Sequence, residues 1–431
     1  MGIVFCALFA LLLTSPFACS RTLPHAFTTS LLDVKASIQR TKDVFSSLPK
    51  TTPPFNQQES VSSSSSWISM ELHSRTSIQK ASHTDYKSLT LARLERDSAR
   101  VRSLTARLDL VIHGISTSDL KPLDGNMEFK AEDLQSPVIS GISQGSGEYF
   151  SRLGIGKPPS SVYMVLDTGS DVSWVQCAPC AGCYRQADPI FEPGSSISYS
   201  HLTCETKQCK SLDISECRNG TCLYEGLFVG AAGLLGLGGG SLSFPSQINA
   251  TSFSYCLTDR DSDSASTLEF NSTLLPNAVT APLIRNHELE TFYFLGITGL
   301  SVGGELLSVP ESAFKMDESG NGGIIIDSGT AITRLQTDTY NSLRKAFVNG
   351  TKNLPSTNGV ALFDTCYDLS SKTRVEVPTN YLIPVDSEGT FCFAFAPTTS
   401  VLSIIRNVQQ QGTRVSFDIA NSRVGFQPNK C

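Results

Sequence analysis

The sequence is poor in histidine and has no excess of positive charge. Of its 6 His residues, only His201 and His287 lie after residue 138, and neither stands near a nucleophile elbow. This argues against a serine hydrolase. The 34 Lys and Arg residues are outnumbered by 40 Asp and Glu residues, so the formal net charge is −6. Nucleic acid is therefore not an expected partner, because proteins that bind it usually carry a strongly basic surface.

Long apolar runs are also rare, and the clearest one stands at the N-terminus. Ile3 to Leu13 is continuously apolar but too short to cross a bilayer. The small residues Ala18, Cys19 and Ser20 follow it, as expected of a cleavage site. We therefore predict a signal peptide over residues 1–20, a destination in the secretory pathway and no membrane anchor.

Cysteine is absent between residues 20 and 176. Eleven of the 13 Cys residues lie from Cys177 onward, and an oxidising compartment predicts that most of them form disulfides. The spacing of Cys177, Cys180 and Cys183 would also suit zinc, but secretion favours disulfides. Because eleven is odd, at least one of these cysteines lacks an intramolecular partner. Possible N-glycosylation sites begin at Asn219, Asn249, Asn271 and Asn349.

The cysteine-free region has the composition of a linker with one amphipathic exception. It includes the run Ser62 to Ser66, and such stretches bury too little apolar surface to offset chain entropy. Between Leu91 and Leu110, Leu and Val residues recur at near-helical spacing, and basic residues crowd the same stretch, namely Arg93, Arg96, Arg100, Arg102 and Arg107. This basic helix is either a surface helix of a propeptide or a cationic segment that covers an acidic cleft before activation.

From Tyr149 onward the pattern changes to short β-rich runs separated by Gly, Pro and Asn, which is typical of a mainly antiparallel β protein. The clearest predicted strands are Tyr163 to Leu166, Ile324 to Ile326, Phe391 to Phe395 and Arg414 to Phe417. One helix is predicted over Thr337 to Val348, with Thr337 as its N-cap and Gly350 just past its end.

Two segments 160 residues apart resemble each other. Val165 to Ser170 reads Val-Leu-Asp-Thr-Gly-Ser, and Ile325 to Thr330 reads Ile-Ile-Asp-Ser-Gly-Thr. In each, an apolar strand delivers an Asp to a buried position, and Gly lets backbone N–H groups approach the carboxylate. The hydroxyl residues on either side can donate hydrogen bonds or hold the two loops together.

Two such loops facing each other would bring Asp167 and Asp327 together. Because two close carboxylates cannot both ionise at ordinary cost, they share one proton and their apparent pKa values separate. The charged member can deprotonate a water, and the protonated member can donate to a substrate carbonyl. This chemistry is the hydrolysis of a peptide bond without a covalent intermediate.

Further motifs make the chain resemble the pepsin-like aspartic proteases, in particular the cysteine-rich, plant nepenthesin-like branch, over roughly residues 140–431. The residues that carry the resemblance are Gly147-Glu148-Tyr149-Phe150, Gly154-Ile155-Gly156, Asp167 to Ser170, Trp174 to Cys177, Cys180, Cys183, Gly233 to Gly238, Phe253 to Leu257, Ile326 to Thr330, Phe363 to Tyr367 and Cys392.

This resemblance implies a mainly β, bilobal fold whose two pseudo-symmetric lobes flank a central cleft. It implies Asp167 and Asp327 as the catalytic dyad, and it adds as supporting loop residues Thr168, Gly169, Ser170, Ser328, Gly329 and Thr330. It also implies protein or peptide substrates, a monomer, no metal and no organic cofactor.

The expected location is the apoplast or another secretory compartment such as the vacuole. The expected organisation is a signal peptide (1–20), a prosegment (21–138), an N-terminal lobe (139–285) and a C-terminal lobe (286–431).

Two segments expected in this family are missing. Tyr224-Glu225 runs directly into Gly226, where relatives have a β-hairpin flap with a Tyr and a further Cys. Likewise Pro378 passes straight to Thr379, where relatives have an extra strand pair, so an open sheet edge is expected. Both gaps read as clean excisions, as from an alternative transcript or an incorrect gene model.

A third departure lies behind the second Asp loop. The family places two apolar residues and a Gly there, as Leu234-Leu235-Gly236 does for the first loop, but Ile404-Ile405 is followed by Arg406. We expect this long cation to clash or to remain unpaired. Together with the missing flap, Arg406 leaves open a second interpretation, a catalytically inactive binding or inhibitor protein on the same fold.

Overall fold

The structure is a computed structural model, and it describes residues 31–46, 68–78, 83–112, 148–180, 183, 186, 188–212, 215–224, 232–428 and 430–431. The predicted signal peptide, the Ser62 to Ser66 run and the Glu225–Gly226 junction lie outside the described residues. No helix among the described residues is long and apolar enough to cross a membrane.

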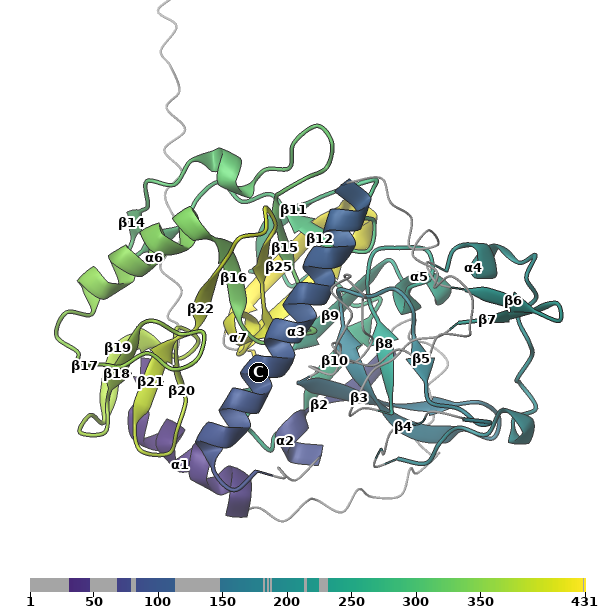
Figure 1. Ribbon diagram of the computed structural model, residues 1–431, viewed down its shortest axis with the longest axis horizontal. Helices are drawn as coiled ribbons and strands as arrows, with labels where there is room; N and C mark the ends of the chain where they lie inside the picture. Colours follow the sequence, from purple (N-terminus) through teal and green to yellow (C-terminus); the bar gives the residue numbers. More distant parts are fainter. Residues whose placement is uncertain are drawn as a thin grey trace, which may run out of the picture.

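The described residues form a mainly β molecule in which one large mixed sheet of 15 strands runs through both lobes (Figure 1). In spatial order these strands are β22 (Phe395–Thr398), β16 (Thr333–Gln336), β23 (Ser403–Ile405), β15 (Ile324–Ile326), β12 (Tyr293–Leu295), β11 (Val279–Ile284), β25 (Arg423–Pro428), β24 (Thr413–Asp418), β9 (Ser252–Cys256), β10 (Ser266–Phe270), β2 (Ile68–Ser74), β3 (Tyr149–Ile155), β4 (Ser160–Asp167), β8 (Gly233–Gly236) and β5 (Trp174–Val175).

Smaller sheets and short helices complete the lobes. The remaining strands are β1 (Leu31–Asp33) with β19 (Arg374–Pro378), β6 (Glu216–Arg218) with β7 (Thr221–Leu223), β13 (Ser301–Val302) with β14 (Glu305–Leu306), and β17 (Ser356–Thr357), β18 (Cys366–Asp368), β21 (Thr390–Phe393) and β20 (Leu382–Pro384). The α-helices are α1 (Val34–Ser46), α2 (Arg75–Ile78), α3 (Tyr86–Ile112), α4 (Lys207–Lys210), α5 (Phe244–Gln247), α6 (Thr337–Gly350) and α7 (Asn407–Gln410).

The expected strands are present, with shifted ends. β4 and β24 contain the runs predicted around Tyr163 and Arg414, and β15 has the predicted bounds. The run from Phe391 to Phe395 is divided between β21 and β22, with Ala394 between them. The side chains of Ile324 to Ile326 are all buried, as expected of a strand enclosed on both faces.

Helix α6 forms where expected, but its cap was predicted wrongly. Gln336 is the N-cap and makes no side-chain capping bond, while Thr337 is the first helical residue. The hydroxyl of Thr337 donates to the carbonyl of Thr398 on β22 instead. Gly350 is the last helical residue rather than the one after the helix.

Parts of the region expected to be linker are folded onto the body. β2 lies inside the large sheet, antiparallel to both β10 and β3, and its Leu72 is fully buried. β1 pairs with β19, and Leu31 lies opposite Pro378. The edge of β19, which was expected to be open, is therefore covered by β1. The linker prediction is therefore wrong for residues 31–46 and 68–78, because Leu32, Val34 and Leu72 are buried in a core contributed by distant strands.

Five disulfides join the described cysteines, which supports the disulfide prediction over the zinc alternative. The pairs are Cys180–Cys183, Cys204–Cys217, Cys209–Cys222, Cys256–Cys431 and Cys366–Cys392. Cys177 is the free cysteine among the described residues, which agrees with the odd count.

Candidate active site

Two equivalent pairs of parallel strands deliver the predicted dyad to the centre of the molecule. β4 ends at Asp167 and runs parallel to β8, while β15 ends just before Asp327 and runs parallel to β23. Apolar residues of β4 and β15 are buried in the core, so each strand fixes the Asp that follows. Asp167 is 2% exposed and Asp327 is 0% exposed.

Each Asp is held by its own loop in the same way. Oδ1 of Asp167 accepts from the backbone N–H of Gly169 at 3.0 Å, and its Oδ2 accepts from the hydroxyl of Ser170 at 2.6 Å. In the second loop, the N–H of Gly329 donates to Asp327 Oδ1 at 2.9 Å, and the hydroxyl of Thr330 lies 3.5 Å from Oδ2. The glycines thus allow the close backbone approach that the sequence predicted.

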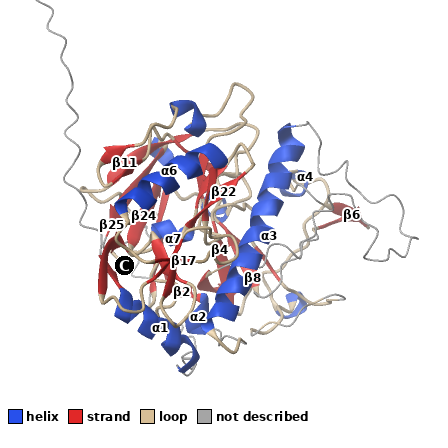
Figure 2. Ribbon diagram, turned by 60° about the vertical axis from the view of Figure 1, so that its left-hand side comes forward, coloured by secondary structure: helices blue, strands red, loops and turns tan. Residues whose placement is uncertain are grey.

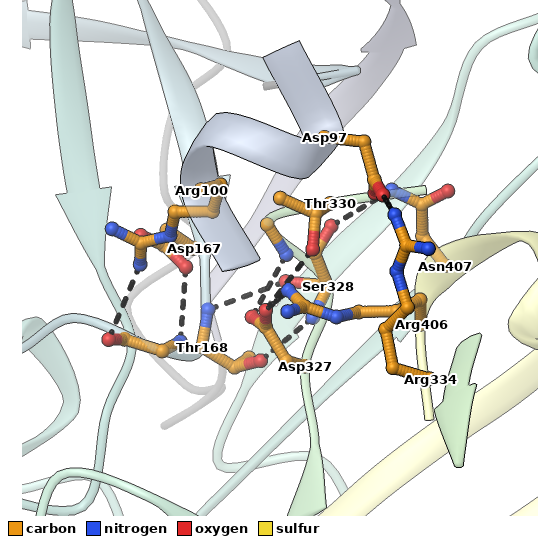
Figure 3. Close-up of polar contacts among 12 residues, drawn as sticks. Asp97, Arg100, Asp167, Thr168, Asp327, Ser328, Thr330, Arg334, Arg406 and Asn407 are labelled. Atoms are coloured by element: carbon orange, nitrogen blue, oxygen red, sulfur yellow. Dashed lines mark hydrogen bonds and ion pairs between the residues drawn. The ribbon is translucent and has the colours of Figure 1, made fainter. Parts of the chain in front are cut away.

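The two loops are also joined to each other. The N–H of Ser328 donates to Oγ1 of Thr168 at 2.9 Å, and the N–H of Thr168 donates to Oγ of Ser328 at 3.3 Å. A carbon atom added at Gly169 would lie 3.1 Å from Asp327 Oδ1 and 3.3 Å from Asp167 Oδ1. Both carboxyl groups therefore border one small space (Figure 3).

Arg406 neither clashes nor remains without a partner, so both expectations about it are wrong. It is completely buried, and its Nη1 forms an ion pair with Oδ2 of Asp327. Its backbone N–H donates to Oγ1 of Thr333 at 2.9 Å. Its Nε and Nη2 have no hydrogen-bond partner among the described residues, so pairing is confined to the side that faces Asp327.

Helix α3 crosses the face of the molecule between the two lobes (Figure 1). Figure 2 shows that it lies outside the sheets rather than within them. Nη2 of Arg100 is 2.7 Å from Oδ2 of Asp167, and it also approaches Oγ of Ser170 at 3.1 Å. A helix from outside the predicted lobes thus places a buried guanidinium directly on the dyad.

One turn earlier on α3, Asp97 supplies a negative charge to the body, where Arg100 supplies a positive one. Its Oδ2 accepts from Nη2 of Arg334 at 2.7 Å, and its Oδ1 accepts from the N–H groups of Ala331 and Ile332 at 2.8 and 3.0 Å. Arg334 belongs to β16, and Asp327 lies between it and Asp167 in the view of Figure 3. The helix is therefore bonded to both lobes.

A further group of charges holds the first half of α3. Arg93 pairs with Asp261 at 3.0 Å and with Glu148 at 3.5 Å, and Arg96 lies 3.4 Å from Glu148. The hydroxyl of Tyr86 donates to Asp261 as well. Arg93, Asp261 and Glu148 have side chains less than 5% exposed, so these bonds are shielded from water and salt.

The environments of the two carboxyl groups move their pKa values in opposite directions. Burial raises the pKa of Asp167, and the nearby charge of Asp327 raises it further against the opposing effect of Arg100. Burial would also raise the pKa of Asp327, but Arg406, Arg100 and the Gly329 N–H together hold it below its usual value. As pH falls, Asp167 therefore takes up a proton at a higher pH than Asp327 does.

The structure brings all eight predicted loop residues together, but sequence reasoning missed Asp97, Arg334 and Glu148. Arg334 stands 237 residues from Asp97 in sequence, so no local pattern links them. A usable signal was Asp97 itself, one of three acidic residues in a helix where basic residues prevail.

The chain matches two family models over most of residues 149–428. The xylanase inhibitor N-terminal model matches residues 149–226 and 223–271, and the xylanase inhibitor C-terminal model matches residues 292–379 and 376–428. Each match is divided into two pieces, and the divisions coincide with the two junctions where the sequence lacks expected segments.

Curated plant proteins are similar over most of their length. The chain is 40% identical to Protein ASPARTIC PROTEASE IN GUARD CELL 2 of Arabidopsis thaliana over 88% of this chain and 91% of that protein. It is 46% identical to Aspartyl protease family protein 2 of the same plant over 79% of this chain and 81% of that protein. It is 34% identical to aspartic proteinase nepenthesin-1 of Nepenthes gracilis over 78% of this chain and 92% of that protein.

Solved structures support the fold. Basic 7S globulin from soybean superposes with a TM-score of 0.51 at 17% identity, over 66% of this chain and 94% of that chain. The crystal structure of edgp gives a TM-score of 0.51 at 18% identity, over 65% of this chain and 91% of that chain. With its duplicated Asp loops, its bilobal β fold and relatives at this level of identity, the chain belongs to the pepsin-like aspartic proteases, in their plant nepenthesin-like branch.

Proposed function

We propose that this chain is the precursor of an aspartic endopeptidase with Asp167 and Asp327 as its catalytic groups. The observation that carries the proposal is that these two buried carboxyl groups border one small space and are held by joined, equivalent loops. Relatives named as aspartic proteases support the same reaction class.

The pKa directions assign different roles to the two groups. Asp327 carries the charge, so it deprotonates a water in the shared space. Asp167 holds the proton, so it donates to the carbonyl oxygen of the substrate. Once Arg100 has left, its lowering effect on the pKa values of both groups is lost, while Arg406 remains beside Asp327 and keeps this division of roles.

In the same proposal, residues 21–138 are a prosegment and α3 is its inhibitory element. A guanidinium on Asp167 occupies the position where a substrate carbonyl would need to lie, and the charges on both lobes hold it there. Cleavage between about Asp133 and Gly147, outside the described residues, would allow the helix to leave. Of the two interpretations of this helix, we thus adopt the cationic segment that covers the cleft before activation rather than the surface helix of a propeptide.

The matches to both family models are divided where the flap and the extra strand pair are missing, which supports excision of two segments. Sequencing the transcript tests this directly. Reads that run without interruption across Glu225–Gly226 and Pro378–Thr379 would contradict an incorrect gene model.

A second candidate is a binding protein without catalysis. The observation that favours it is the buried ion pair between Arg406 and Asp327, because a cation on the general base lowers its basicity. The missing flap would further weaken water exclusion and substrate positioning.

Activity at acidic pH separates the two candidates. The full-length chain is incubated at low pH and assayed on a protein substrate, with and without an inhibitor that mimics the transition state of aspartic proteases. Inhibitor-sensitive cleavage that is lost in Asp167→Asn supports the endopeptidase. Correct folding without any such cleavage supports the binding protein.

The remaining proposals concern location and form. The disulfides and plant relatives fit a secretory-pathway protein. We extend this to a cleaved signal peptide, glycosylation at the four Asn sites, release to the apoplast or vacuole, protein or peptide substrates, and a monomer. Treatment with a glycosidase that removes N-linked glycans should increase mobility on a gel.

A further inference from the structure

Three donors of the C-terminal lobe enclose the carboxylate of Asp97 at the dyad. They are the N–H groups of Ala331 and Ile332 and the guanidinium of Arg334, all within 3.0 Å of a carboxylate oxygen. Asp97 is 1% exposed. The proposed acid–base chemistry uses none of these contacts, so this built carboxylate site has no assigned role beyond holding α3 (Figure 3).

The donors belong to the protein body, whereas the carboxylate belongs to the helix that must leave. Ala331 and Ile332 directly follow the second Asp loop, and Arg334 is on β16. Asp97 is the carboxylate with which Arg334 forms an ion pair among the described residues. Arg334 is only 7% exposed, and a buried cation that loses its partner is costly until another anion takes that place.

We propose that, once α3 has left, this cluster is a subsite for an acidic side chain of the peptide substrate. The inference rests on the proposed endopeptidase function. A guanidinium N–H on one oxygen and two backbone N–H donors on the other match the two oxygens of a carboxylate. Asn or Gln offers one oxygen and an amino group to the same donors, so one donor would remain unpaired.

The helix indicates where along the substrate the acidic residue binds. Asp97 and Arg100 are three residues apart, which is about 4.5 Å along a helix axis. An extended peptide advances about 3.3 Å per residue, so the acidic residue stands one or two positions from the scissile bond. The chain continues on both sides of Asp97, so the subsite takes an internal residue rather than a C-terminus.

The first test measures cleavage. Full-length chain processed at acidic pH is given matched peptides with Asp or Asn at each of the two positions on either side of the scissile bond, all with amidated C-termini. At one position, kcat/KM should favour Asp by about tenfold to hundredfold, the range of a charge-assisted bond. In Arg334→Gln this ratio should fall toward one, while the surface variant Arg285→Gln keeps it.

Three results would overturn the subsite. They are an Asp to Asn ratio near one at every position in the natural chain, the same ratio in Arg334→Gln, or a preference that appears only with a free C-terminal carboxylate. Each of these requires cleavage to occur, so none can be confused with failure of the proposed function.

The second test needs no cleavage. A labelled peptide with the sequence of residues 83–102 is added to the acid-treated full-length chain, beside the same peptide carrying Asp97→Asn. The natural peptide should bind about tenfold more tightly, and Arg334→Gln should remove the difference. This pattern without any peptidase activity would keep the carboxylate subsite and reject the endopeptidase, whereas binding of both peptides with equal affinity would reject the subsite.

Discussion

Gly236 lies opposite Asp167 in the strand pair β4–β8, and Arg406 stands at the corresponding position beside Asp327, after the pair β15–β23. At Gly236 an added Cβ would lie 2.9 Å from the carbonyl oxygen of Ser170, so only backbone fits behind the first loop. Behind the second loop, a whole guanidinium is enclosed and paired with the carboxylate of Asp327. Two equivalent loops therefore differ in what lies behind them, which is close-packed backbone behind Asp167 and a buried charge behind Asp327.

This difference is also why the two pKa values separate. Around Asp327, burial is opposed by the charges of Arg406 and Arg100 and by the N–H of Gly329, which together lower the pKa. Around Asp167, burial and the neighbouring carboxylate dominate, and the pKa is raised. The asymmetry of the dyad is built partly into the body itself, since Arg406 does not belong to α3.

The largest effect should come from making the second loop like the first. Arg406→Gly removes one partner of a buried ion pair, which typically costs about 3–5 kcal/mol of unfolding free energy. It should also raise the pKa of Asp327, so the acid limb of the pH–activity profile moves to higher pH. Denaturant unfolding at neutral pH measures the first effect, and Arg285→Gln at the surface is the control. Unchanged stability would mean that the charge of Arg406 is not what holds Asp327.

The next effect compares how each lobe binds α3. Arg100→Gln removes the bond to Asp167, and Asp97→Asn weakens the bond to Arg334, so each should weaken helix docking by about 1.5–3 kcal/mol. Hydrogen exchange of the α3 amides in the full-length chain measures this loss, and the exposed Arg102→Gln serves as control. Faster exchange in only one variant would show that a single lobe retains the helix.

A smaller effect is expected behind the first loop. Gly236→Ala forces a Cβ against the carbonyl groups of Ser170 and Asp171, and such overpacking costs about 1–3 kcal/mol. Thermal unfolding measures it, with Gly194→Ala as the control because no atom lies within 4 Å of an added Cβ there. Equal melting of the two variants would refute close packing as the means by which Asp167 is held.

The smallest difference concerns the order in which acid weakens the contacts of α3. Burial raises the pKa of Asp167, so its attraction to Arg100 is lost as soon as pH falls through that elevated value. Burial works against a low pKa at Asp261 too, but Arg93 and Arg260 outweigh it. The contribution of Asp261 is fully present above its unfolded pKa of about 3.9 and is lost as pH falls through its lower folded pKa. As pH is lowered, amides near Arg100 should therefore lose their protection from hydrogen exchange at a higher pH than amides near Arg93. The reverse order would contradict these pKa directions.

The local parts of the site were predictable from sequence because their signals are short in range. An apolar strand followed by Asp, a hydroxyl residue and Gly is enough to place each carboxylate. The ion pairs of Arg406 and Asp97 were not predictable, since their partners stand 79 and 237 residues away. β2 could have been predicted in part. Its residues Ile68, Met70 and Leu72 alternate with polar residues, which indicates a strand, but the serine run just before them suggested a linker.

The bond between Cys256 and Cys431 spans 175 residues and ties the last residue of the chain to the central strand β9. A peptidase that cuts anywhere between these two cysteines therefore yields two fragments that still migrate together on a non-reducing gel. Loss of the N-terminal segment, which contains no cysteine from residue 20 to residue 147, would be visible on the same gel. Running reduced and non-reduced samples side by side therefore distinguishes removal of that segment from internal damage to the body.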